Sequence, residues 1–370
     1  MSYGLGIDVG TTFVSAAVSR RGAAQMVRAD GGFPLMPSVV QMSPDGSLTV
    51  GEPTSVTSGL PEMAAHLFRR RLGDSTPIQL GGRATTAGDL LTALLSGALE
   101  RVTALEGGPP AHVVVTCPAV WGPYRREQFA EVTRRAGLGR DEVTLLTEAE
   151  AVAIHYLGSR PRGGPEPIAV YDAGGSSFDA TVIRTSQAGP AGRTGTNSIG
   201  VLGVPESLEW FGGVDIDAAV MAHLDLASDG VVGLLDTGRP DDAMRWRRVR
   251  DACVRAKESL STVAEVVVDL PFTGPGRRTT LRRDWLEEWI RPQLAAGLPA
   301  LRRGLDSAGM RAADLGAVLL TGGTARIPLV SRMLTEDLGR PVVMLPEPQH
   351  CAALGAALVA GRTGPPGWRR

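Results

Sequence analysis

One local pattern occurs twice in this 370-residue chain, about half a chain apart. Each copy has an apolar strand that ends in an aspartate, then a glycine-rich turn with hydroxyl side chains, then a second apolar strand. Such a turn lets backbone N–H groups approach a phosphate closely, and the aspartate can hold a hydrated Mg²⁺. Two turns that face each other would hold a nucleotide triphosphate and its metal from both sides. The repeat therefore predicts a duplicated α/β architecture.

The two copies supply the first candidate binding residues. The first copy contains Asp8, Gly10, Thr11 and Thr12. The second copy contains Asp172, Gly174, Gly175, Ser176, Ser177 and Asp179. For either copy alone, an ordinary glycine-containing hairpin turn would explain the residues equally well. Finding both, each after an apolar strand, favours phosphate binding.

A third glycine-rich turn follows the apolar strand expected over residues 315–320. Gly322 and Gly323 would allow the flat approach of a purine and its ribose, and the guanidinium of Arg326 could stack on the base. A helix start with Thr324 as its cap explains the same segment. The two interpretations are compatible.

The sequence lacks the motifs of other common nucleotide-binding and enzyme classes. It has no P-loop run, no dinucleotide fingerprint, and no metalloprotease or nucleophile-elbow motif. The five histidines and three cysteines lie far apart without ligand spacing. The formal net charge of -1 gives no argument for a nucleic-acid or membrane partner. We find no signal peptide and no stretch near the roughly 20 apolar residues of a membrane helix, so we expect a cytoplasmic protein.

Hydrophobic spacing predicts the remaining elements. Helices are expected over residues 61–72, 86–104, 125–136, 148–157, 215–225, 245–260, 284–305, 329–338 and 352–360. Pro292 and Pro299 should break the helix over 284–305. Two short strands should flank a turn at 43–46, and further strands are expected at 113–115 and 266–270. Residues 185–196 are predicted to form an exposed hairpin tip, and the tail from 362 to 370 should fray.

In this order the three motifs resemble those of the actin, sugar-kinase and chaperone ATPase superfamily. Within it, the chain most resembles the heat-shock protein 70 family, from Gly6 to Gly361. Further segments that carry the resemblance are Val113–Ala119, Thr147–Ala153, Gly212–Gly213, Arg255–Ser261 and Leu354–Ala357. The resemblance implies an actin-like ATPase fold, with two duplicated RNase H-like domains of mixed sheets flanked by helices around a central nucleotide cleft. We expect the first lobe over 1–165, with 345–370 packing back on it. The second should span 166–344, with an adenine-clamp subdomain at about 212–290.

The resemblance also implies a role for each candidate residue. Asp8 and Asp172 would organise Mg²⁺ and its waters, and Thr11 and Ser177 would contact the terminal phosphates of ATP or ADP. Glu148 and Asp179 would place the attacking water or a K⁺ ion. The adenosine would lie among Gly213, Gly322, Gly323 and Arg326, with Lys257 and Ser261 on the opposite wall. The reaction would be in-line attack of water on the γ-phosphate.

Several residues depart from the family pattern. Arg69 stands where the family has its catalytic lysine, which keeps the charge but presents a larger, planar group. We expect slower hydrolysis with binding retained. Ser176 replaces a glycine and would be strained if its φ had to be positive. Gln349 replaces an aspartate that is common near the nucleotide. After residue 361 no acidic linker and no peptide-binding β-sandwich follow, so a full-length chaperone is not expected unless the chain is a fragment.

Three functions stay open on the sequence alone. The first is ATP binding with slow hydrolysis by a chaperone-like nucleotide-binding domain. The second is a nucleotide-dependent switch with little turnover, which reports ATP to an unidentified protein partner or co-chaperone; Arg69 and Ser176 favour it. The third is an actin-like filament subunit, which needs complementary end surfaces. A sugar kinase is a weaker fourth hypothesis, because no clear aspartate base is found.

Overall fold

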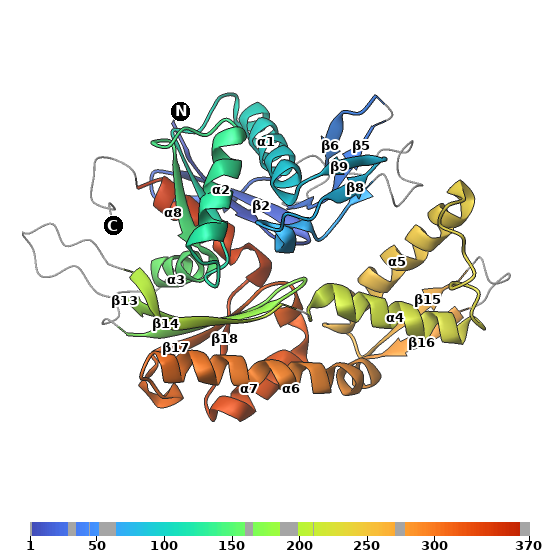
Figure 1. Cartoon of the computed structure of the whole chain (residues 1–370). Coiled ribbons are helices and arrows are strands. Elements are labelled where there is room, and N and C mark those ends of the chain that lie inside the picture. Colours follow the sequence, from blue (N-terminus) through green and yellow to red (C-terminus); the bar gives the residue numbers. More distant parts are fainter. Residues whose placement is uncertain are drawn as a thin grey trace, which may run out of the picture.

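The computed structural model describes residues 2–28, 35–43, 45–51, 64–159, 166–185, 199–209, 211–270 and 278–362. Two lobes lie one above the other in Figure 1, each built on its own sheet. The predicted hairpin tip beyond Thr185 and the tail beyond Arg362 lie outside the described residues. No helix in the described ranges is both long enough and apolar enough to cross a membrane.

The first sheet has the order β11-β10-β1-β2-β3, with β4 also paired to β2. Its strands are β1 (Gly4–Val9), β2 (Phe13–Arg20), β3 (Ala23–Met26), β4 (Leu35–Pro37), β10 (His112–Cys117) and β11 (Val143–Thr147). β1 runs antiparallel to β2 and parallel to β10, which is parallel to β11. Both faces are covered at the centre: Leu5 and Ile7 are buried on one face of β1, and Gly4 and Gly6 are buried on the other.

The second sheet repeats this arrangement, with the order β14-β13-β12-β17-β18. Its strands are β12 (Ile168–Ala173), β13 (Phe178–Thr185), β14 (Ile199–Leu208), β17 (Ala317–Thr321) and β18 (Val343–Met344). β12 runs antiparallel to β13 and parallel to β17, as β1 does with β2 and β10. The predicted duplication and the actin-like α/β fold are confirmed. The exact lobe limits at 165/166 and 344/345 stay a prediction.

Two helices cross between the lobes (Figure 1), α3 (Glu148–Gly158) and α8 (Cys351–Ala360). α8 packs on β1, β2 and β10 of the first sheet, whereas α3 packs on β12, β13 and β14 of the second. Small residues let the two helices approach closely, because a methyl group at Gly355 would overlap the carbonyl oxygen of Ala151. This crossing places the ends of β1 and β12 near one another.

The outer faces carry the longer helices. In the first lobe α1 (Ala87–Glu106) packs against α2 (Pro123–Arg135). In the second lobe α6 (Arg283–Ser307) lies on β13 and β14 and contacts α7 (Pro328–Leu338). Short 3-10 turns follow at 312–314, 324–326 and 348–350.

Each lobe also bears a smaller extension, both on the right of Figure 1. The first consists of β5 (Val40–Met42), β6 (Leu48–Val50), β7 (Ala64–Ala65), the 3-10 turn η2 (Phe68–Arg71), β8 (Ile78–Leu80) and β9 (Arg83–Thr85). The second consists of α4 (Gly213–Ala227), α5 (Pro240–Leu260), β15 (Glu265–Asp269) and β16 (Arg278–Arg282). It lies within residues 212–290, and the assignment of this range as an adenine-clamp subdomain stays a prediction.

Two predictions of helices were wrong. A helix was predicted over residues 61–72. The described part of this range, 64–72, contains β7 and the single turn η2 instead. Ala65 pairs with Val40 of β5, and Leu67 has a positive φ, both incompatible with a continuing helix. The buried Phe68 and Leu72 produced the misleading helical spacing.

The second error concerns the prolines of α6, which runs unbroken through Pro292 and Pro299. Each proline removes a backbone hydrogen bond. Buried side chains on both sides of each proline, among them Ile290, Leu294 and Leu301, hold the helix on the sheet. Tertiary packing therefore outweighs the local penalty.

Candidate active site

The two glycine-rich turns touch each other, one from each lobe. A methyl group at Gly175 would overlap the side-chain oxygen of Thr12, so only glycine fits at this approach. A hydrogen bond to a backbone carbonyl also holds each turn. The N–H of Gly174 donates to the carbonyl of Ser177 at 2.9 Å, and the hydroxyl of Ser38 donates to the carbonyl of Gly10 at 2.8 Å. The two predicted phosphate turns thus come together at the middle of the molecule.

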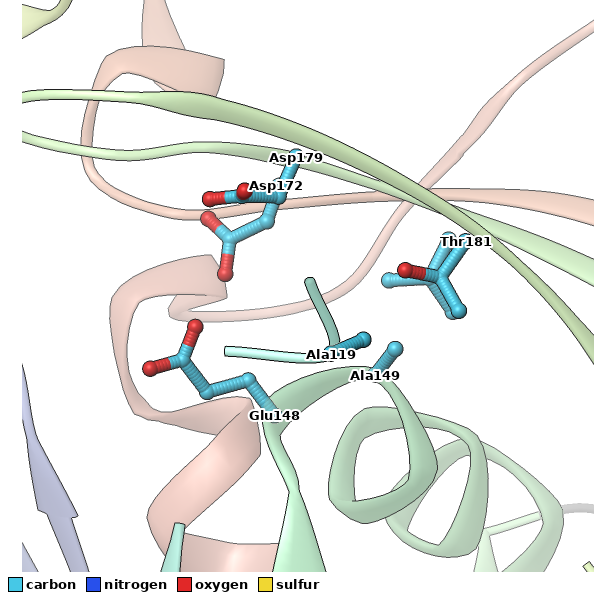
Figure 2. Close-up of a pocket in the computed structure, with 7 residues that line it drawn as sticks. Ala119, Glu148, Ala149, Asp172, Asp179 and Thr181 are labelled. Carbon is cyan, nitrogen blue, oxygen red and sulfur yellow. The ribbon is translucent and has the colours of Figure 1, made fainter. Parts of the chain in front are cut away.

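Four acidic side chains gather beneath these turns. Asp8 is the last residue but one of β1, Asp172 and Asp179 face each other across the β12–β13 pair, and Glu148 begins α3. Figure 2 shows Glu148 pointing toward Asp172 and Asp179 across a small pocket that Ala119, Ala149, Val170 and Thr181 also line. A capping box between Thr147 and Glu150 starts α3 and so fixes the position of Glu148.

Burial raises the pKa of every one of the four acids. Burial raises the pKa of Asp172 to about 7, and the negative charges of Asp179 and Asp8 add to the rise. Burial likewise raises the pKa of Glu148 well above its usual range, with the charge of Arg69 opposing it. Burial also raises the pKa of Asp8 and of Asp179, although hydroxyl donors at Thr116 and Ser177 respectively work against it. The cluster therefore favours the arrival of positive charge.

Arg69 is the cation that lies within this cluster. It forms an ion pair with Glu148 and donates from Nη1 to the carbonyl of Val9 at 2.8 Å. Its guanidinium carbon lies 5.6 Å from the centre of the Trp121 ring. Burial alone would lower the pKa of Arg69, but the charges of Glu148, Asp8 and Asp179 raise it above its usual value. The structure thus brings Arg69 together with the predicted acids.

The hydroxyl residues expected to contact phosphate line a second pocket beside the acids. Thr11, Ser176 and Ser177 border it together with Arg69 and Asp179. The hydroxyl of Ser177 donates to Asp179 at 2.7 Å. Ser176 is buried and its φ is not positive, so the strain considered for this substitution does not arise.

The third glycine turn packs directly against the second. Gly322 has φ +88°, and a methyl group there would overlap Asp172 and the carbonyl of Ala173. Gly323 faces open space, and Arg326 is exposed beside it. The hydroxyl of Thr324 donates to the carbonyl of Gly174 at 2.8 Å. The prediction that Thr324 caps a helix was wrong, because α7 begins only at Pro328.

On the opposite wall, Lys257 is bound rather than free. Its ammonium donates to the carbonyl of Gly213 at 3.1 Å and pairs with Asp217 at 2.8 Å. These contacts tie α5 to the start of α4, which holds Gly213 next to Gly175. Ser261 lies just past the end of α5, where its N–H caps the helix. No contact of its side chain with the other candidates is recorded among the described residues.

Sequence reasoning missed several residues that complete the site. Thr116 donates to Asp8 at 2.6 Å, and Asp217 holds Lys257. Thr116 pairs with Asp8 across β1–β10 as Thr321 pairs with Asp172 across β12–β17, and this register is visible only in the structure. Trp121, beside Arg69, was not distinguishable from a core residue.

The four acids suit a metal ion that keeps its water ligands better than one coordinated directly by several protein side chains. Among the described residues, no group of three or more histidine, cysteine or acidic side chains forms a metal cage. Mg²⁺ commonly keeps several waters and is held by one or two carboxylates plus phosphate oxygens. Asp8 and Asp172, with raised pKa values and a surplus of negative charge around them, suit that mode.

Comparison with known proteins agrees with this geometry. The family model described as Hsp70 protein matches residues 54–365. A chaperone protein DnaK from Elusimicrobium minutum is 28% identical over 368 residues, covering 96% of this chain and 57% of its own. A DnaK from Methanothermobacter thermautotrophicus is 29% identical over 378 residues, covering 96% and 59%. A chaperone protein HscA homolog from Acidithiobacillus ferrooxidans is 29% identical over 389 residues, covering 96% and 58%.

The duplicated sheets and the paired glycine turns define a protein with the actin-like ATPase fold. Because the family model covers most of the chain, this protein belongs to the Hsp70 family. It spans somewhat more than half the length of the curated relatives named above.

Proposed function

We propose that this chain binds Mg²⁺–ATP between its lobes and hydrolyses it slowly. The observation that carries the proposal is the contact between the two glycine turns at Thr12 and Gly175, above four acids that share one embedded guanidinium. A triphosphate with its metal would supply the positive charge that the acids lack and the anionic charge that the turns are built to receive.

Each residue then has a physical task. Thr11 and Ser177 offer hydroxyl donors to the terminal phosphates from opposite lobes. Asp8 and Asp172 hold the waters of Mg²⁺, which when bound would neutralise charge that develops on the phosphates. Asp179 and Glu148 accept hydrogen bonds from the attacking water or coordinate a K⁺ ion. The adenosine lies over Gly322 and Gly323 beside Arg326, with the Lys257 and Ser261 wall opposite.

The surroundings of Arg69 support the proposal that ATP hydrolysis is slow. Its ion pair with Glu148 and its bond to Val9 hold the guanidinium among the acids. A planar fork fixed in this way is less free than an ammonium to follow the phosphate as charge shifts during transfer. A switch that binds ATP with little turnover is the second candidate, and this same pair favours it.

The test combines calorimetry with phosphate release on the purified protein. We expect Mg²⁺-dependent binding of ATP and ADP, and phosphate release faster than that of Asp172→Asn. Binding without such release would support the switch instead. No Mg²⁺-dependent binding of either nucleotide would overturn both functions. Co-chaperone binding and a cytoplasmic location remain part of the same proposal; the names of the relatives describe them only as chaperone proteins.

A further inference from the structure

Three consecutive arginines on η2 have three different surroundings. Arg69 is paired with the acids, as described above. Arg71 points outward, where it pairs with Asp74 at 3.3 Å and donates to the carbonyl of Thr76 at 2.7 Å. Arg70 differs from both, because it crosses to the other lobe and donates to the carbonyl oxygen of Ser176 in the second phosphate turn.

Arg70 is a charged group held by a neutral partner. Within the described ranges no carboxylate is ion-paired with it, and its Nε is buried without a hydrogen-bond acceptor. A guanidinium in a partly enclosed site gains most from an anion that can accept two of its N–H groups. The hydrogen bond to Ser176 uses one N–H group of Arg70 and leaves its Nε without an acceptor.

The surrounding pocket has the chemistry of an anion site. Arg70 lines it with the hydroxyl residues Thr11, Ser176, Ser177 and Ser207. The side-chain oxygen of Thr12 in the adjoining turn is buried without a hydrogen-bond partner. Two acids also border the pocket, but Asp179 accepts from Ser177 and Glu209 pairs with Arg125 at 3.4 Å. Hydrogen-bonding groups thus remain for a ligand.

We propose that Arg70 is a second cationic ligand for the terminal phosphate of ATP and makes the site prefer ATP over ADP. With no triphosphate bound, its guanidinium rests on the Ser176 carbonyl; with ATP bound, it turns to the γ-phosphate. The inference rests on the proposed function, because Thr11 and Ser177 of the same pocket are the residues assigned to the terminal phosphates. ADP lacks the group that Arg70 would contact.

The variant Arg70→Gln tests this, with Arg71→Gln as its matched control from the same turn. Calorimetry with Mg²⁺ should compare ADP with a non-hydrolysable ATP analogue. We expect Arg70→Gln to weaken the analogue roughly 10- to 100-fold, as for loss of a charge-assisted hydrogen bond. Its ADP affinity should change less than about threefold. Arg71→Gln should match wild type, and Arg70→Lys should fall between.

The outcomes separate this inference from the proposed function. If wild type binds neither nucleotide, the proposed function fails. If wild type binds both but Arg70→Gln keeps the wild-type ratio of the two affinities, the role of Arg70 is refuted. Equal weakening of both nucleotides would also refute it, because a merely structural role predicts that result. Should Arg70→Gln not fold, Arg70→Lys keeps the comparison, since a lysine that leaves the ratio unchanged would overturn the proposal.

Discussion

At the scale of single residues, the acid cluster costs stability in the absence of ligand. Asp8, Asp172, Asp179 and Glu148 all have raised pKa values, so the fold resists their ionisation. Within the described ranges, Glu148 is the one acid that forms an ion pair with Arg69. Such a cost is expected where a site is built for a cation that arrives with its substrate. A substitution at Asp172 can measure how much stability the acid cluster costs.

We predict that Asp172→Asn stabilises the nucleotide-free protein at pH 8. The pKa of Asp172 is about 7 in the fold, against 3.8 for an unperturbed aspartate. Between those values unfolding releases a proton, so the free energy of unfolding falls as pH rises from about 4 to 7 and is then flat. The asparagine removes this loss, and we expect a gain of roughly 1–3 kcal/mol at pH 8.

Urea unfolding at pH 5 and pH 8 measures this gain, which should be much smaller at the lower pH. Exposed Asp141→Asn is the control and should change neither value by more than about 0.5 kcal/mol. The same Asp172→Asn protein should lose Mg²⁺-dependent nucleotide binding. A variant that is less stable than wild type at pH 8 would contradict the interpretation.

A second residue-scale prediction concerns Arg69→Lys. A lysine keeps the positive charge near Glu148 but gives up the bond to Val9 and the broad contact with Trp121. We expect phosphate release to rise several-fold with nucleotide affinity changed less than about threefold. Single-turnover phosphate release and calorimetry measure the two quantities separately. Turnover at or below wild type would show that the arginine does not limit the reaction.

At the scale of elements, the crossing of α3 and α8 depends on one missing methyl group. At Gly355 a methyl would overlap the backbone of Ala151, so Gly355→Ala must push the two helices apart. We predict a loss of at least about 3 kcal/mol in the free energy of unfolding. Gly304→Ala in α6 is the matched control. Its nearest neighbours would lie 3.8 Å away, so it should stabilise by about 0.5–1 kcal/mol. Chemical denaturation of both variants checks the opposite signs.

The elements also show what the sequence could and could not predict. The duplicated strand pairs were predictable, because an aspartate at a strand end and a glycine turn are local signals. Most helices were predictable from spacing. The segment around η2 was not, because its structure depends on pairing with β5, distant in sequence. The predicted break of α6 at its two prolines was wrong because buried contacts with the sheet, which the local sequence does not show, hold the helix together.

The candidate site divides in the same way. Residues within the three turns could be predicted, and the structure brings them together. The partners that orient them could not, because they come from other strands and helices. Thr116 reaches Asp8 only through the β1–β10 register, and Asp217 reaches Lys257 only through the packing of α4 on α5. Arg70 needed the contact between lobes to stand out from its two neighbours.

At the scale of the whole molecule, the two lobes have separate hydrophobic cores. One core includes Leu94 and Phe129 of the first lobe, and the other includes Ile216 and Leu301 of the second. Between them, α3 and α8 pack on the second sheet through a third apolar cluster that includes Val152, Val170 and Leu319. Polar pairs such as Arg70 with Ser176 and Arg125 with Glu209 also join the lobes. Separate cores joined by one layer of helices can unfold in separate steps.

We therefore predict that nucleotide couples the unfolding of the lobes. Hydrogen exchange along a urea gradient should show different midpoints for peptides of β1–β2 and of β12–β13 in the nucleotide-free protein. With Mg²⁺–ATP at 100 times its dissociation constant, binding should add about 2.7 kcal/mol and bring the two midpoints together. The coupling follows because the ligand contacts both turns and is lost when either lobe opens. Asp172→Asn with the same nucleotide should keep its midpoints apart. Coincident midpoints in the nucleotide-free wild type would show instead that the α3–α8 layer alone makes the lobes one cooperative unit.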